Sequence, residues 1–157
     1  MFSYHHFLIF TLLHFTCGRT VSVIYAVVNQ MDMLFFIPLA LFYDWIQIPI
    51  FGILLEQSTS RLKVLSWLKK RVNKAMESME NKAFLRRIIN LGDIGVILVS
   101  ALPIRGFGIL SGSILTFFMK KGRKEGSFLL LTGSLMGIFI TMALATSAMD
   151  LIKGYIR

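Results

Sequence analysis

The apolar stretch at residues 91–119 constrains the fold of this chain more than any other feature of its sequence. It is long enough to cross a bilayer, since a spanning helix needs about 20 apolar residues. However, Pro103 and several glycines interrupt it, and Arg105 stands at its centre. Basic segments flank it on both sides, and an excess of Lys and Arg marks cytoplasmic loops. Both ends should therefore lie on the cytoplasmic side, which predicts a re-entrant hairpin with its turn near residues 103–108.

The composition agrees with a membrane location. Of the 157 residues, 55% are apolar and 16% are charged, and the mean hydropathy is +0.70. A typical soluble domain is about 45–50% apolar and about 25% charged, and a small one cannot bury so much apolar surface. We therefore predict a multi-pass integral membrane protein of the cell membrane, with residues 1–157 forming a single membrane domain.

The formal net charge of +9 comes from clustered residues. Nine of the seventeen Lys and Arg lie between Arg61 and Arg87, and four lie between Lys120 and Lys124. Such clusters are typical of cytoplasmic loops near anionic lipid headgroups. A nucleic-acid surface would interleave aromatic residues with the basic ones, so we expect no nucleic-acid partner.

Two regions read as membrane-crossing helices. Residues 33–55 hold two prolines, a glycine and Asp44, so we expect a broken or kinked span. Residues 128–152 are rich in small residues, and Gly133 and Gly137 form a GxxxG pair. Small residues let helix backbones approach closely in lipid. Packing within this one chain is the preferred interpretation of that pair, and a dimer contact is the alternative.

Residues 1–28 resemble the 91–119 region in inverted form. Residues 1–18 and 29–32 contain no Lys or Arg, so both should be extracytoplasmic, with Arg19 near the tip of a first hairpin. The predicted fold is all-α, with two inverted halves that each hold a re-entrant hairpin and a transmembrane helix, an arrangement that transporters use. Lys153 and Arg157 would then lie outside, against the charge rule, so the absolute topology stays open.

Residues 61–90 connect the two halves. Apolar residues recur there at three- and four-residue steps among many basic ones, which predicts an amphipathic helix roughly 45 Å long. We expect this helix to lie on the cytoplasmic membrane surface. A coiled coil is the alternative, although the apolar stripe lasts only about three heptads.

Arg105 is the first candidate for substrate binding. A charge near the bilayer centre is costly and usually faces a cavity or a partner, and backbone N–H groups freed by glycines can bind an anion. The alternative is that Arg105 pairs with Asp44 or Asp93 and holds the halves together. Arg19 in the other half has the same two interpretations, and there the structural pairing is preferred, because its surroundings lack prolines and multiple glycines. The candidate substrate-binding residues are Arg19, Arg105, Pro103, Gly106, Gly108 and Gly112.

Asp44 and Asp93 are the candidate proton-coupling residues. Burial raises the pKa of a carboxyl group, and Asp44 lies deepest in a predicted span. A salt bridge is the alternative for Asp44, and placement at the membrane interface is the alternative for Asp93. We expect the three histidines, His14 included, to lie at the interface, without a metal site. The sequence contains no nucleophile–base, P-loop or dinucleotide motif, so we expect neither an enzyme nor a cofactor.

Three short motifs carry a family resemblance: residues 91–96 (LGDIGV), residues 101–108 (ALPIRGFG) and residues 111–113 (SGS). With the small-residue final helix, they resemble the second half of the small multidrug export protein family, which is similar in plan to the broader DedA/VTT membrane proteins. The resemblance covers about residues 91–147. It implies two facing hairpins and, in the broader group, lipid translocation or polyprenyl-phosphate transport, often with proton dependence. The family's acid–x–arginine pattern at the first tip is only half present, since Arg19 follows Cys17 and Gly18.

The leading hypothesis is therefore a small transporter or lipid-translocating protein for an anionic or amphipathic substrate, with proton coupling as a possible feature. Its expected partners are membrane lipids, and it would work as a homodimer or within a larger membrane complex. The alternative is a non-catalytic accessory or structural subunit of such a complex.

Overall fold

The computed structural model describes residues 4–56, 88, 90–103 and 108–156. Their regular structure is helical, which confirms the predicted all-α class for this part of the chain. The predicted amphipathic helix at 61–90 falls almost wholly outside the described residues, as do Arg105 and Gly106. The helices are α1 (Tyr4–Thr16), α2 (Arg19–Val28), α3 (Met33–Glu56), α6 (Asp93–Ala101), α7 (Ile109–Phe118) and α8 (Arg123–Ile156).

Two helices are long and apolar enough to cross a membrane. The candidate spans are Met33–Ile53 within α3 and Arg123–Tyr155 within α8. At a rise of 1.5 Å per residue, α3 is about 36 Å long and α8 about 51 Å, so both exceed a hydrocarbon core of about 30 Å. Of the two expectations for the first span, a break or a kink, the break is wrong, because α3 continues through Pro38 and Pro49. Membrane helices tolerate prolines where neighbouring groups satisfy the freed carbonyls.

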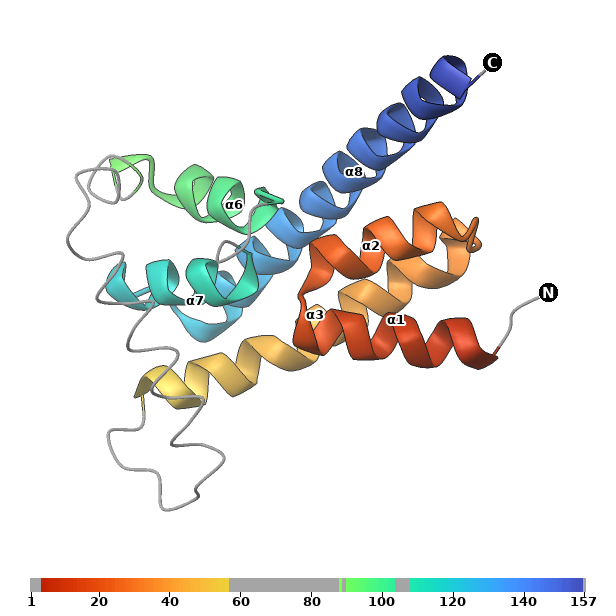
Figure 1. The fold of residues 1–157 in the computed structure, drawn as a ribbon. Coiled ribbons are helices and arrows are strands. Elements are labelled where there is room, and N and C mark those ends of the chain that lie inside the picture. The colour runs from red at the N-terminus through yellow and green to blue at the C-terminus, as the bar shows by residue number, and fades with distance from the viewer. Residues whose placement is uncertain (1–3, 57–87, 89, 104–107, 157) are drawn as a thin grey trace.

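The N-terminal region forms a helical hairpin. Helices α1 and α2 pack against each other and run in opposite directions (Figure 1). The turn between them depends on Gly18, whose φ of 93° is a conformation that side chains disfavour. Its backbone N–H closes the end of α1 by donating to the Leu13 carbonyl at 3.0 Å. With 13 and 10 residues, α1 and α2 are each about 15–20 Å long, too short to span the bilayer alone.

Helices α6 and α7 form a second short pair. They lie side by side with opposite directions (Figure 1) and contain nine and ten residues. Gly108, with a φ of 122°, precedes the first residue of α7. The turn predicted at residues 103–108 therefore falls between these two helices, although only its ends are described.

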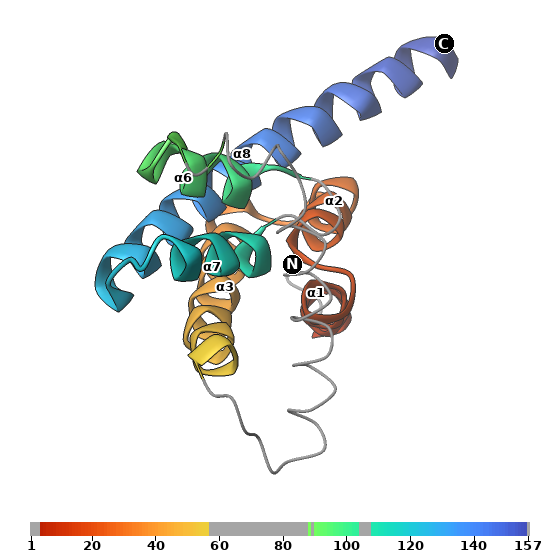
Figure 2. The ribbon, with the colours of Figure 1, turned by 90° about the vertical axis from the view of Figure 1, so that its left-hand side faces the viewer.

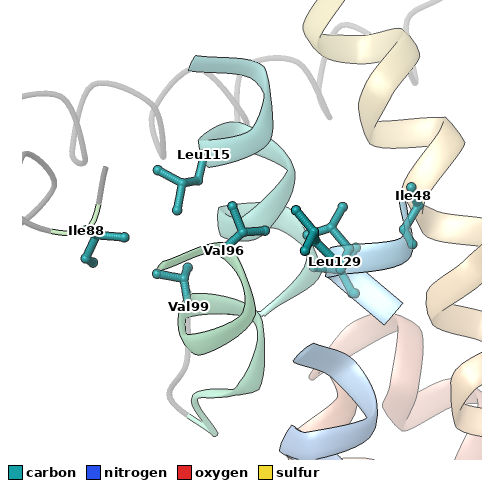
Figure 3. Packing of buried hydrophobic residues seen from close by; sticks show 8 residues of the cluster. Ile48, Ile88, Val96, Val99, Leu115 and Leu129 are labelled. Atoms are coloured by element: carbon teal, nitrogen blue, oxygen red, sulfur yellow. The ribbon is translucent and has the colours of Figure 1, made fainter. Parts of the chain in front are cut away.

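The two short pairs approach the middle of the molecule from opposite ends, and α3 and α8 each pack against both of them (Figures 1 and 2). One apolar cluster joins α1, α2, α3 and α8 around Phe10, Phe36 and Ile138. The other joins α3, α6, α7 and α8 around Val96, Leu115 and Leu130; Figure 3 shows this cluster. These clusters position the polar side chains that lie between them.

Candidate functional site

Arg19 links the first hairpin to the second pair of helices. It is the first residue of α2, and only 8% of its surface is exposed. Its Nη2 donates to the backbone carbonyl of Ser100 at 2.6 Å, near the end of α6. Its Nη1 lies 3.4 Å from Asp44 Oδ2 on α3. One guanidinium therefore links α2 to both α3 and α6, as the planar fork of arginine donors allows.

Gly137 of α8 makes the position of Arg19 possible. A Cβ atom at this residue would lie 2.7 Å from the Ala101 carbonyl oxygen and would also meet the Arg19 guanidinium. Gly133, one turn earlier, faces the Ile97 carbonyl and Ser100 in the same way. The structure thus confirms the preferred interpretation of this GxxxG pair, which packs against α6 and Arg19 of its own chain.

Asp44 is the centre of the polar network. It lies midway along α3 and is only 2% exposed. Its Oδ1 lies 3.1 Å from His14 Nε2, and its Oδ2 accepts hydrogen bonds from Arg19 and from the Ser134 hydroxyl on α8. The salt-bridge alternative for Asp44 is therefore realised with Arg19.

His14 belongs to this network, so its expected placement at the membrane interface is wrong. Its side chain is buried near the end of α1, and its Nδ1 lies 3.0 Å from Ser22 Oγ. The Ser22 hydroxyl donates its single proton to the Arg19 carbonyl at 2.8 Å, so it accepts from Nδ1–H of His14. Nε2 of His14 then faces Asp44, and one proton lies between the imidazole and the carboxyl group.

The network retains unused hydrogen-bonding groups. Among the described residues, Arg19 Nε and Ser100 Oγ are buried without a hydrogen-bond partner. Most buried polar groups are hydrogen-bonded, and exceptions require an explanation such as a bound water or a functional role. Both residues belong to the same contact, because the Ser100 carbonyl accepts a hydrogen bond from Arg19 Nη2.

The remaining predicted site residues are distributed around this network. Pro103 follows the end of α6, and Gly108 precedes α7. Gly112 lies inside α7, where an added Cβ would meet Ser100 and Leu130. Arg105 and Gly106 lie outside the described residues.

Asp93 lies apart from the buried network. It is the first residue of α6, and its exposed carboxylate forms an ion pair with Lys121 at 2.7 Å. Lys121 also pairs with Glu125 at 2.6 Å. The hydrogen bonds to Asp93 and Glu125 raise the pKa of Lys121 above its ordinary value.

The burial of an ion pair does not by itself show that the pair stabilises the fold. Desolvation of two charges can exceed their attraction, and apolar replacements of such pairs are often neutral or stabilising. Ionisable residues inside a membrane therefore indicate a functional site by default. Within the described ranges, no three His, Cys, Asp or Glu side chains come together as metal ligands would.

Comparison with known proteins gives one match. A family model described as "Putative small multi-drug export protein" matches residues 19–140. The match begins at Arg19 and includes Asp44, Ser100 and Ser134, whereas His14 precedes it. Neither a curated protein nor a solved structure matches the chain. The match supports the recognised family but not its link to the DedA/VTT group, and it points to a transporter rather than an enzyme.

Proposed function

The chain belongs to the small multi-drug export protein family, and we propose that it transports an anionic or amphipathic substrate past the network of Arg19, Asp44 and His14. The family and the two apolar helices indicate a membrane protein of a transport class. The observation that carries the proposal is the buried Arg19, which contacts Asp44 of α3 and the end of α6 at once.

The substrate's anionic group would interact with Arg19. The guanidinium has an unused buried N–H at Nε, and the hydroxyl of Ser100, whose carbonyl contacts Arg19, also lacks a described partner. Arginine recognises carboxylates and phosphates through paired N–H donors. An anion at this place would compete with Asp44 for Arg19. Arg105, Gly106 and the flanking Pro103 and Gly108 remain our predicted contacts at the second turn.

The His14–Asp44 pair supports proton coupling. When an anion takes Arg19, Asp44 loses its cationic partner. His14 Nε2 lies 3.1 Å from Asp44 Oδ1, close enough for the two groups to exchange a proton. Substrate binding and proton uptake at Asp44 would thereby be linked. Asp93, exposed and paired with Lys121, has no such environment in the described structure.

The helix lengths support the proposed re-entrant arrangement. Helices α1, α2, α6 and α7 are each too short to cross about 30 Å of hydrocarbon. Facing hairpins between two long helices would bring the turns to the middle of the membrane, where transporters with inverted halves bind their substrates. Irregular backbone at that depth has to be covered by protein or line a cavity.

A liposome assay tests the proposed function. The full chain would be reconstituted, and the movement of a fluorescent phosphatidylglycerol between leaflets would be followed by quenching from outside, with and without a pH gradient. We expect Asp44→Asn to reduce the movement at least about tenfold, since it removes the charge that Arg19 and His14 contact. Asp32→Asn is the matched control, because Asp32 is exposed and its Oδ1 accepts a hydrogen bond from the backbone N–H of Leu34 in the first turn of α3.

The outcomes are decisive for the network. If Asp44→Asn moves the probe as fast as Asp32→Asn and the wild-type protein do, the buried network is not the transport site. If the wild-type protein moves no probe under either condition, the proposed lipid-like substrate is wrong.

A further inference from the structure

A cavity lies at the other end of α3 from the hairpin α1–α2. It has a volume of about 220 Å³ and lies between the C-terminal part of α3, the end of α7 and the beginning of α8. Its walls include Ile48 and Gly52 of α3 and Phe117 of α7, while Lys121 and Arg123 line it where α8 begins. The cavity is thus apolar on one side and cationic on the other.

One side chain in this cavity lacks a partner. Ser113 lines the cavity and is 4% exposed, and its Oγ has no hydrogen-bond partner among the described residues. A buried hydroxyl is normally hydrogen-bonded. An occupant with a polar or charged oxygen would satisfy it.

The charge near the cavity favours an anion. Asp93 and Glu125 take two of the three N–H donors of Lys121, which leaves the third for an occupant. Lys120, Arg123 and Lys124 add further positive charge in the same short segment. The cavity also includes Gly122 and Arg123, where α8 begins, and the N-terminus of a long helix favours negative groups.

The position of the cavity favours a lipid over a free anion. It lies beside the basic segment that the charge rule places at the cytoplasmic boundary of the membrane. Ile53 and Phe117, which line it, are also 48% and 43% exposed, so apolar surface continues outward from it. A phosphate headgroup could enter beside Lys121 while acyl chains follow the exposed apolar surface.

We propose that this cavity binds the headgroup of an anionic phospholipid. It differs from the transport site, since its lining does not include Arg19, Asp44 or His14. At about 220 Å³ it is smaller than a typical drug-sized pocket of roughly 300–1,000 Å³. It would therefore take the phosphate and glycerol parts of the lipid and leave the acyl chains outside.

The test counts lipids bound to the full chain in detergent by native mass spectrometry. Phosphatidylglycerol, phosphatidylcholine and soluble glycerol phosphate are the three probes. Gly52→Leu would obstruct the cavity without a clash, because an added Cβ meets nothing within 4 Å. Gly154→Leu is the matched control, since it also has open space and lies near the end of α8, outside the cavity. Lys121→Gln removes a positive charge at the cavity, and Lys153→Gln is its matched control because it removes one elsewhere.

We expect Gly52→Leu and Lys121→Gln to weaken phosphatidylglycerol binding about tenfold relative to their controls, as loss of a charge-assisted contact does. Phosphatidylcholine should bind weakly to every variant, and glycerol phosphate should not displace the lipid. Equal phosphatidylglycerol binding by Gly52→Leu and Gly154→Leu would overturn the proposal, as would equal binding of the two lipids or displacement by glycerol phosphate.

The same measurement separates this site from the transport site. Asp44→Asn should keep phosphatidylglycerol at the cavity even if it abolishes movement across the membrane. If Asp44→Asn loses the bound lipid together with Gly52→Leu, the cavity is not an independent site and the proposal fails.

Discussion

Gly137→Ala should disrupt the contact between α8 and the buried network. The new Cβ would lie 2.7 Å from the Ala101 carbonyl oxygen, a backbone atom, and would meet the Arg19 guanidinium. Arg19 has little freedom to move, because Ser100 and Asp44 hold it. Overpacking of a close contact typically costs about 1–3 kcal/mol. In an unobstructed helix position the same substitution gains up to about 1 kcal/mol from helix propensity.

The expected change in the free energy of unfolding therefore has opposite signs for Gly→Ala substitutions at two glycines of α8. Gly137→Ala should lower the free energy of unfolding by up to about 2 kcal/mol after the full propensity gain is subtracted. Gly154→Ala, where nothing lies within 4 Å of the added Cβ, should leave it unchanged or raise it slightly. Denaturant unfolding of both variants in the same detergent measures the difference. If Gly137→Ala is as stable as Gly154→Ala, the described approach of α8 to Arg19 and α6 is wrong.

Two further predictions concern the charged groups. Asp44→Leu should destabilise the protein by about 3–5 kcal/mol because it leaves Arg19 buried without its carboxylate, and adding Arg19→Met should recover most of that loss in the same unfolding assay. If Arg19→Met recovers less than half of the lost stability, Arg19 and Asp44 do not interact directly. The hydrogen bond to Asp93, and after it the one to Glu125, raises the pKa of Lys121. This shift predicts that the protein loses stability at alkaline pH. The stabilisation from Lys121 should be complete below the ordinary lysine pKa near 10.5 and be lost as the pH rises through the higher pKa of the folded state. When the free energy of unfolding is measured against pH, this alkaline loss should be absent in Lys121→Gln.

Hydropathy and charge predicted much of the architecture. The two regions expected to cross the membrane fall within α3 and α8, and helix breaks occur at Gly18 and between α6 and α7, where glycine interrupts the apolar pattern. These features depend on local composition, so the sequence carries them directly. The continuity of α3 through Pro38 and Pro49 could not be read in this way, because it depends on neighbouring groups in the folded chain.

The buried network was only partly predictable. Asp44 and Arg19 were both recognisable as charges inside apolar segments, but their mutual contact is set by the packing of α1–α2 against α3 and α8. Ser134 lies ninety residues from Asp44 along the chain, and nothing local links the two. His14 was grouped with the terminal histidines, although an ionisable residue between apolar neighbours is itself a signal for a functional site.

The proposed function depends most on how the α6–α7 region is oriented in the membrane. Cysteine accessibility tests it in a Cys17→Ser background, since Cys17 is the single native cysteine. Asn90→Cys and Lys120→Cys place exposed thiols just before and just after this region, and Asn29→Cys marks the opposite side. A membrane-impermeant maleimide applied to intact and then permeabilised cells should label positions 90 and 120 from the same side and position 29 from the other. Labelling of 90 and 120 from opposite sides would make 91–119 a plain membrane span and contradict the proposed facing hairpins.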